Sequence, residues 1–278
     1  MERTLPTLPL VHKRRRGANE HHRGVDSHIR ECDNIVRECG HACHHVEGNE
    51  GVHEMDEGRT PTAGSDSGRL GKRMKANFIY RFDPERHLHI INESVVPGLT
   101  SVCETEGLSD YSGIPEVIRQ AAMDFGSDVH LATDLLDRGI LDEESLTDRV
   151  AGCMAGYKRF HREHRVEWMW CEEPCGYGQG NLYGCVIDRA GKLDWKKAVV
   201  EIKTGQPQPW HGPQLAAQRE AMRYHHGFTA GKAFGLYLNP SGTYRLIDYS
   251  QELDSHFSAF LSALNLHQWR KRYLRNET

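Results

Sequence analysis

A break in sequence character near residue 73 limits what this chain of 278 residues can fold into. Large apolar residues are sparse in residues 1–73 and follow neither a helical nor a strand period. Such a segment cannot bury enough surface to offset its chain entropy, so we expect a disordered tail. We expect residues 74–278 to form one folded domain. Met74 is a candidate for the true start, so a protein of residues 74–278 should stay soluble and active.

After the break, two apolar periods alternate along the chain, one typical of helices and one typical of strands. Pro115 and Gly139 bound the first long helix, which we expect to be interrupted near Gly126. A polar turn around Gly191-Lys192 is expected between two of the strands. The expected helices span residues 115–137, 142–164, 214–224 and 253–273, and the expected strands span residues 78–82, 87–91, 166–171, 182–188, 198–203, 232–238 and 244–249. This order predicts an α/β domain with a mixed sheet.

The charge balance narrows the possible functions. The formal net charge is −4, and the tail holds equal numbers of basic and acidic side chains. A protein that coats DNA is usually basic, whereas an enzyme that holds DNA in one groove need not be.

No apolar run is long enough for a transmembrane helix, and no apolar stretch follows the basic residues near the N-terminus. We therefore expect a cytoplasmic protein with no membrane partner.

The eight cysteines do not make a disulfide framework in a chain of this length, so we expect reduced thiols. Cys171 and Cys175 flank the end of an expected strand, and we interpret them as ordinary thiols. In the tail, Cys32, Cys39 and Cys43 could bind zinc together with a neighbouring histidine, but their spacing is not that of a standard finger. No zinc site is predicted there.

Two acidic residues and a lysine stand at the ends of neighbouring expected strands. Asp188 ends an apolar strand, and Glu201 and Lys203 lie in the next one, with Ile202 between them. Alternate residues of a strand face the same side, so Glu201 and Lys203 should point one way and Ile202 into the core. Carboxylates suit a hard divalent cation, and a lysine can stabilise developing negative charge. The set is suitable for phosphodiester hydrolysis.

Each of these residues taken alone has an ordinary explanation. A Glu-x-Lys triplet is usually an exposed, salt-bridged strand face, and an aspartate before a turn is equally common. The functional interpretation depends on their joint arrangement with the surrounding motifs. Those motifs are Gly184-x-x-x-Asp188, Glu201-Ile202-Lys203-Thr204-Gly205, the helical segment that begins at Gln214, and the upstream Gly126-Ser127-Asp128-Val129-His130.

Together these motifs resemble the RecB-like, phage-type branch of the PD-(D/E)XK nucleases, over about residues 77–275. The resemblance implies a restriction-endonuclease-like fold, with a mixed central sheet flanked by helices. It implies a DNA nuclease, more specifically an exonuclease, that hydrolyses phosphodiester bonds with a metal-activated water. The cofactor would be Mg²⁺ or Mn²⁺ and the partner DNA. Protein partners are left open.

The resemblance also assigns roles to single residues. Asp188 and Glu201 would bind the metal, His130 would be an additional ligand, and the carbonyl of Ile202 would complete the site. Lys203 would assist hydrolysis. Gln214 matches the family's glutamine near the active site, whereas Gln218 stands where the family pattern has a tyrosine.

The sequence argues against an iron–sulphur cluster and leaves two alternatives to the nuclease function open. Some RecB-like nucleases hold an iron–sulphur cluster with cysteines beyond the glutamine motif, but this chain has no cysteine after Cys185, so no cluster is expected. A catalytically inactive relative that acts as a DNA-binding or assembly module is the main alternative. An unrelated binding protein with a chance match is the second alternative.

Glu173 ends an expected strand near the site and is interpreted as a solvated residue.

Overall fold

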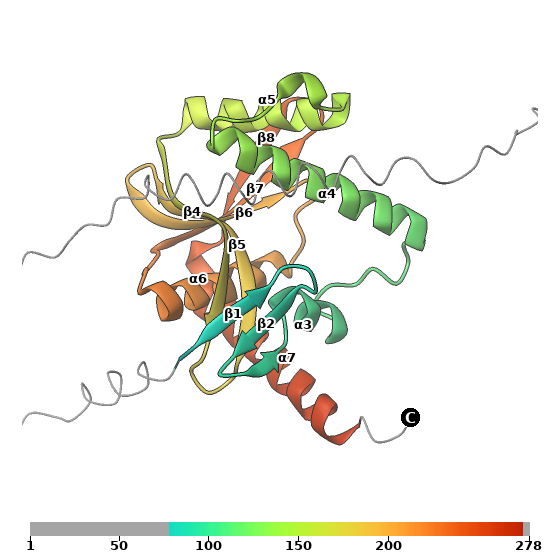
Figure 1. The fold of residues 1–278 in the computed structure, drawn as a ribbon, viewed down its shortest axis with the longest axis vertical. Helices are drawn as coiled ribbons and strands as arrows, with labels where there is room; N and C mark the ends of the chain where they lie inside the picture. The colour runs from blue at the N-terminus through green and yellow to red at the C-terminus, as the bar shows by residue number, and fades with distance from the viewer. Residues whose placement is uncertain (1–77, 275–278) are drawn as a thin grey trace, which may run out of the picture. The chain divides into compact units, whose positions relative to one another are not determined.

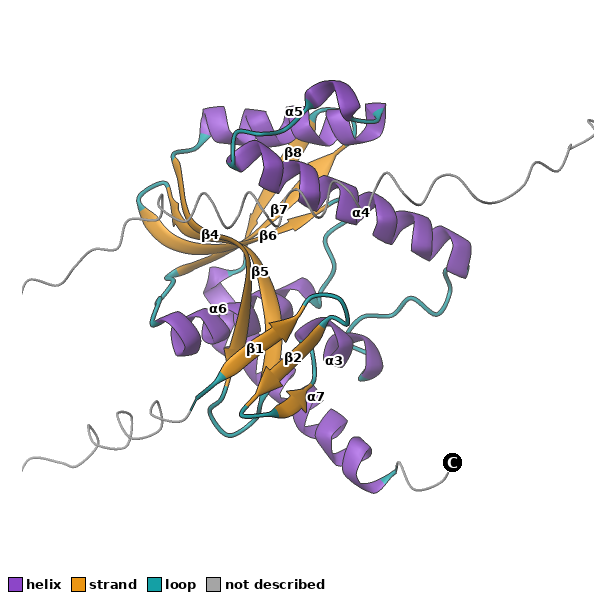
Figure 2. Cartoon of the chain, viewed as in Figure 1, coloured by secondary structure: helices purple, strands orange, loops and turns teal. Residues whose placement is uncertain are grey.

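A computed structural model describes residues 78–274. Its centre is a five-stranded mixed sheet in the order β4-β5-β6-β7-β8 (Figures 1 and 2). Only β6 and β7 pair in parallel, and helix α6 makes the crossover between them that a parallel pair requires. The strands are β4 (Val166–Tyr177), β5 (Tyr183–Leu193), β6 (Lys196–Lys203), β7 (Lys232–Asn239) and β8 (Thr243–Asp248). The predicted α/β class with a mixed sheet is confirmed.

Helices cover both faces of this sheet (Figure 1). On one face, α4 (Glu116–Asp137) and α5 (Asp148–Glu163) pack on the inward-facing side chains of β6 and β7, which include Val200 and Ile202. On the other face, α3 (Leu99–Thr105), α6 (His211–His226) and α7 (Leu253–Tyr273) pack on β4 and β5. Short 3₁₀ turns, Glu143–Ser145 and Ser250–Glu252, precede α5 and α7.

A small antiparallel sheet stands at the end of the β4–β5 hairpin. It comprises β1 (Tyr80–Asp83), β2 (Leu88–Ile91) and β3 (Ser94–Val96), and a bridge between Gly98 and Gly184 joins it to β5. The ring of His89 lies so close to Gly184 that a Cβ atom there would stand 2.1 Å from His89 Cγ. This contact requires the glycine of the Gly184-x-x-x-Asp188 motif and fixes the small sheet beside the strand that carries Asp188.

The predicted interruption of the first long helix is wrong. Helix α4 is continuous through Gly126, a residue that costs only about 1 kcal/mol in a helix interior. A side chain at Gly126 would point toward Thr204, just beyond β6. His130 lies one turn later on the same helix face, so the path of α4 past the end of β6 carries the histidine toward Asp188.

The predicted turn at Gly191-Lys192 is also wrong, because both residues lie inside β5. The hairpin turns at Asp194 and Trp195, which have φ values of +49° and +68° and form a two-residue loop. Gly191 is needed in the strand because a Cβ atom there would lie 2.2 Å from the carbonyl oxygen of Glu167, at an irregularity of β4. The glycine reflects a close approach between strands.

Other boundaries differ by smaller amounts. Strand β4 continues to Tyr177, well beyond the expected end at residue 171, and β5 continues to Leu193, so Asp188 lies inside the strand that it was expected to end. The helix expected over 142–164 becomes a 3₁₀ turn followed by α5. Strand β3 and helix α3 were not predicted. Helices α6 and α7, the β7–β8 hairpin and the positive φ of Gly139 agree with the predictions.

None of the helices in residues 78–274 combines the length and apolar character needed to cross a bilayer. The expected tail, its cysteines Cys32, Cys39 and Cys43, and the proposed start at Met74 lie outside the described residues.

Candidate metal centre

The candidate centre lies where β5 and β6 separate. Their pairing extends from Leu193–Lys196 to Arg189–Val200, so Asp188 and Glu201 are the first residues beyond it. Both side chains are buried. Asp188 Oδ2 accepts a 2.6 Å hydrogen bond from the backbone N–H of Ile202. Because the N–H and C=O of one strand residue point to the same side, the Ile202 carbonyl faces the same gap. The Ile202 side chain is fully buried on the opposite face, as predicted.

His130 and Glu172 complete a cluster with Asp188. His130 Nδ1 lies 3.6 Å from Asp188 Oδ1 and 3.6 Å from Glu172 Oε1. One potential ligand atom from each of the three residues lies within 4.8 Å of the others. Helix α4 therefore brings the sequence-predicted histidine to the sequence-predicted aspartate.

Glu172 was not identified from the sequence. It has a φ of +48°, a left-handed conformation that non-glycine residues rarely adopt. It stands in β4 between Cys171, which pairs with Arg189, and Glu173, which pairs with Ile187. Strained backbone of this kind is concentrated at functional sites. The only sequence signal was the acidic pair 172–173 beside the strand that carries Asp188.

Glu201 is held by three donors. Its Oε1 accepts hydrogen bonds from Lys203 Nζ at 2.7 Å and Gln214 Nε2 at 2.6 Å, and its Oε2 accepts one from Gln218 Nε2 at 2.6 Å. Among the described residues, the cluster of mutually close ligand atoms does not include Glu201. Its carboxylate is nevertheless near enough to influence the charge of Asp188 and His130.

The two glutamines come from successive turns of α6, on the face that covers the sheet. Gln218 also donates to the carbonyl of Val186 at 3.2 Å. Gln214 Oε1 is buried and has no hydrogen-bond partner among the described residues. A buried acceptor without a donor is uncommon, so this oxygen is available to a bound group.

Lys203 stays charged in this environment. Desolvation lowers the pKa of its ammonium group, but Glu201 and Asp188 outweigh that effect and raise the pKa above its usual value. The ammonium also lies 5.2 Å from the centre of the Trp210 ring. A lysine that remains protonated can orient or stabilise negative charge but cannot act as a general base.

The carboxylates and histidine perturb one another. Desolvation and the nearby charge of Glu201 raise the pKa of Asp188. Desolvation lowers the pKa of His130, but Asp188, Glu172 and Glu201 together raise it to about 9. Desolvation favours the neutral form of Glu201, yet Lys203 and Gln218 lower its pKa. Burial of several acidic groups at one point is costly unless cations accompany them.

Arg189 stands directly behind this cluster and is fully buried. Its guanidinium donates to Asp137 Oδ2 at 2.7 Å, Glu172 Oε1 at 3.0 Å and Thr133 Oγ1 at 3.1 Å. It therefore connects β5 to α4 and orients Glu172. Sequence patterning did not identify this residue.

The centre opens into a cleft of about 820 Å³. Asp188, Glu201 and Gln214 lie on its wall. The wall is completed by the small sheet, the start of α3 and the last turns of α7, which contribute His87, Thr100, Ser101, His267, Arg270 and Lys271, among others. Arg270 and His267 both pair with Glu106, so part of this basic surface is already neutralised.

The donor set fits a hard divalent cation. Carboxylate and carbonyl oxygens are the ligands that Mg²⁺ prefers, and an imidazole suits Mn²⁺ as well. Asp188, Glu172, His130 and the Ile202 carbonyl face one gap, with Glu201 adjacent. A cation there would offset the repulsion between buried carboxylates.

This fit predicts a thermal response. Mn²⁺ at about a hundred times its dissociation constant should stabilise the protein by about 2.7 kcal/mol, which raises the melting midpoint by roughly 5–10 °C. Asp188→Asn should melt no lower than wild type in EDTA, because it removes a repelled charge, and should lose most of the Mn²⁺ response. His130→Ala should need more Mn²⁺ for the same shift. Identical Mn²⁺ titrations of all three proteins, followed by circular dichroism, would speak against this centre.

No protein-family model matches this chain, and a comparison with curated proteins finds no match.

Proposed function

We propose that this protein is a metal-dependent deoxyribonuclease with a restriction-endonuclease-like fold of the PD-(D/E)XK type. The observation that carries the proposal is the arrangement of Asp188 with Glu201 and Lys203 at the point where β5 and β6 cease to pair, next to the histidine of α4. The buried Ile202 between the two charged residues and the glutamine helix behind Glu201 support the same assignment.

The cation would be Mg²⁺ or Mn²⁺. Asp188, Glu201, His130 and the Ile202 carbonyl would hold it, as the resemblance implies, and Glu172 would be a further ligand from the edge strand. When bound, it would polarise a phosphoryl oxygen and lower the pKa of a water molecule. Hydrogen bonds keep the acidic side chains in place. The Ile202 amide donates to Asp188, Arg189 donates to Glu172, and the two glutamines donate to Glu201.

The chain's own residues supply orientation and charge. Gln214 and Gln218 donate hydrogen bonds to the two oxygens of Glu201 and so favour one orientation of its carboxylate. Lys203 presents a permanent positive charge beside the same carboxylate, suited to the negative charge that develops on a phosphoryl group during hydrolysis. Preorganised charge of this kind needs no rearrangement during the reaction.

The cleft supports a nucleic acid as substrate. It leads from the carboxylates past hydroxyl and basic side chains, including Thr100, Ser101 and Lys271. Such groups contact phosphate oxygens and fix the position of a strand without reading its sequence. The overall charge of −4 agrees with binding confined to this cleft.

A digestion assay tests the proposed activity. Full-length protein should degrade linear double-stranded or single-stranded DNA with Mg²⁺ or Mn²⁺. As an exonuclease it should leave covalently closed circular DNA intact. Cleavage of the circles would replace the exonuclease assignment with an endonuclease one. Metal-dependent DNA binding without cleavage of any DNA or RNA would favour the alternative of an inactive binding module.

A further inference from the structure

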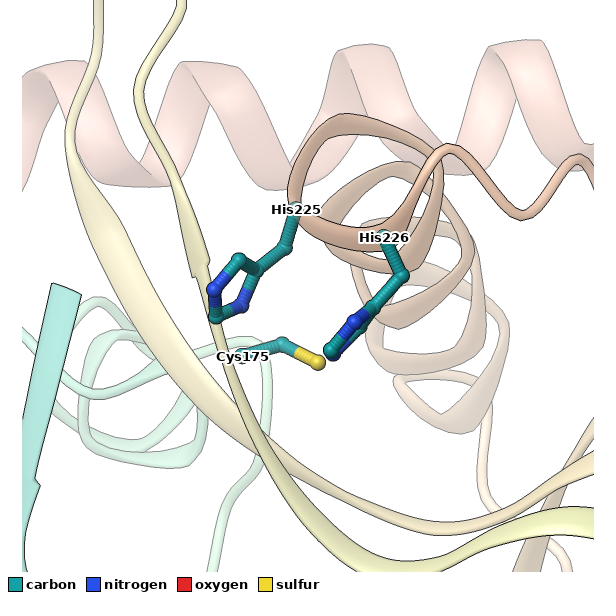
Figure 3. A group of neighbouring side chains, drawn as sticks. All are labelled: Cys175, His225 and His226. Atoms are coloured by element: carbon teal, nitrogen blue, oxygen red, sulfur yellow. The ribbon is translucent and has the colours of Figure 1, made fainter. Parts of the chain in front are cut away.

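A second cluster of ligand-type side chains lies on the other face of the sheet. Cys175 of β4 faces His225 and His226, the last two residues of α6 (Figure 3). One potential ligand atom from each residue lies within 4.8 Å of the other two. The two imidazole rings are stacked, with centroids 4.5 Å apart.

The surroundings of these groups favour a metal ion of the zinc type. Cys175 Sγ is buried and lies 3.3 Å from the thioether sulphur of Met222. His226 Nε2 lies 3.0 Å from Glu173 Oε1. A carboxylate on one nitrogen of an imidazole is the usual device for orienting a metal-binding histidine.

Two neighbouring acidic residues in the middle of β4, Glu172 and Glu173, belong to different centres. Glu172 points toward His130 of α4, whereas Glu173 points toward His226 of α6. The thiol and the two imidazoles are therefore distinct from the carboxylate centre, and their softer donor set suits a different ion.

We propose that Cys175, His225 and His226 bind one Zn²⁺ ion, with Glu173 orienting His226. In a tetrahedral zinc site the ligand atoms lie about 3.3–3.6 Å apart, so small side-chain rotations would close the cluster. Binding releases the thiol proton of Cys175 to solvent and forms a zinc–thiolate bond. The ion would attach the end of α6 to the edge strand β4. Because α6 also carries Gln214 and Gln218, the zinc ion would stabilise the helix that holds Glu201.

Cobalt substitution tests this site in the full chain. Cys32, Cys39 and Cys43 are first replaced by serine, and an untagged protein is used, so that no tail thiol contributes. Titration with Co²⁺ should give a sulphur-to-cobalt charge-transfer band in the near ultraviolet that saturates at one ion per chain. Zn²⁺ should then abolish the band. The carboxylate centre offers no thiolate, so Co²⁺ bound there cannot produce this signal.

Variants in the same background locate the site. Cys175→Ser should abolish the band, whereas Cys153→Ser, a buried thiol in α5, should leave it unchanged. His226→Ala, at the more exposed end of α6, should fold normally and weaken Co²⁺ binding at least tenfold. Absence of a charge-transfer band at saturating Co²⁺ would overturn the proposal, as would a band of full intensity in folded Cys175→Ser or unchanged Co²⁺ affinity in His226→Ala. None of these readouts depends on nuclease activity.

Discussion

Lys203→Ala should lower the turnover of DNA cleavage by about a hundredfold or more, while leaving the fold and most DNA binding intact. The ammonium group lies 2.7 Å from Glu201 Oε1 at the end of β6. Its removal leaves Glu201 with its two amide donors, so the carboxylate stays in place. The loss should therefore fall on kcat, because the lysine acts on charge that develops only in the transition state.

Two matched variants test the origin of that loss. Lys196→Ala removes an exposed lysine from the other end of the same strand and should retain wild-type turnover. Lys203→Arg keeps the positive charge and should retain more activity than Lys203→Ala. The measurements are single-turnover cleavage rates and DNA affinity by fluorescence anisotropy. A Lys203→Ala protein within twofold of wild type would mean that this lysine is only a structural partner of Glu201.

Arg189→Ala should destabilise the protein by about 3–5 kcal/mol. The guanidinium is fully buried and satisfies Asp137 and Glu172 at once. Removing it leaves Asp137, whose side chain is 9% exposed, without its closest positive partner. Breaking a buried pair costs much more than breaking an exposed one, because an uncompensated charge stays behind.

Urea denaturation measures this effect directly. The control is Arg165→Ala, which removes a half-exposed arginine paired with Glu167 on the protein surface and should cost at most about 1 kcal/mol. A loss of less than 1 kcal/mol in Arg189→Ala would show that Asp137 is adequately solvated or held by Tyr157 alone, which donates to the same carboxylate at 2.7 Å.

Strand periodicity predicted the central part of the candidate site. It indicated that Glu201 and Lys203 share a face and that Ile202 is buried, and the structure agrees. Such positions depend only on alternation within one strand, a local property. The same reasoning gave the class of the fold and most helix positions, because their apolar periods are long enough to be distinct.

Other features could not be read from the sequence, because they depend on contacts between distant segments. The contribution of Glu172 depends on a left-handed backbone inside β4, and that of Arg189 on partners in α4 about fifty residues earlier. The sequence left the role of Gln218 open, and only its contact with Glu201 reveals its part in the site. Gly191 was mistaken for a turn because the close approach of β4 is invisible in the sequence.

The central claim is that acidic side chains at the point where β5 and β6 separate hold a divalent cation that is required for cleavage of DNA. The most direct test is cleavage of end-labelled linear DNA by wild type and Asp188→Asn, purified in parallel and assayed with Mg²⁺, with Mn²⁺ and with EDTA. Wild type should cleave only with a metal. Asp188→Asn should remain folded and be inactive in all three conditions. Cleavage by wild type in EDTA, or equal cleavage by Asp188→Asn, would contradict the account.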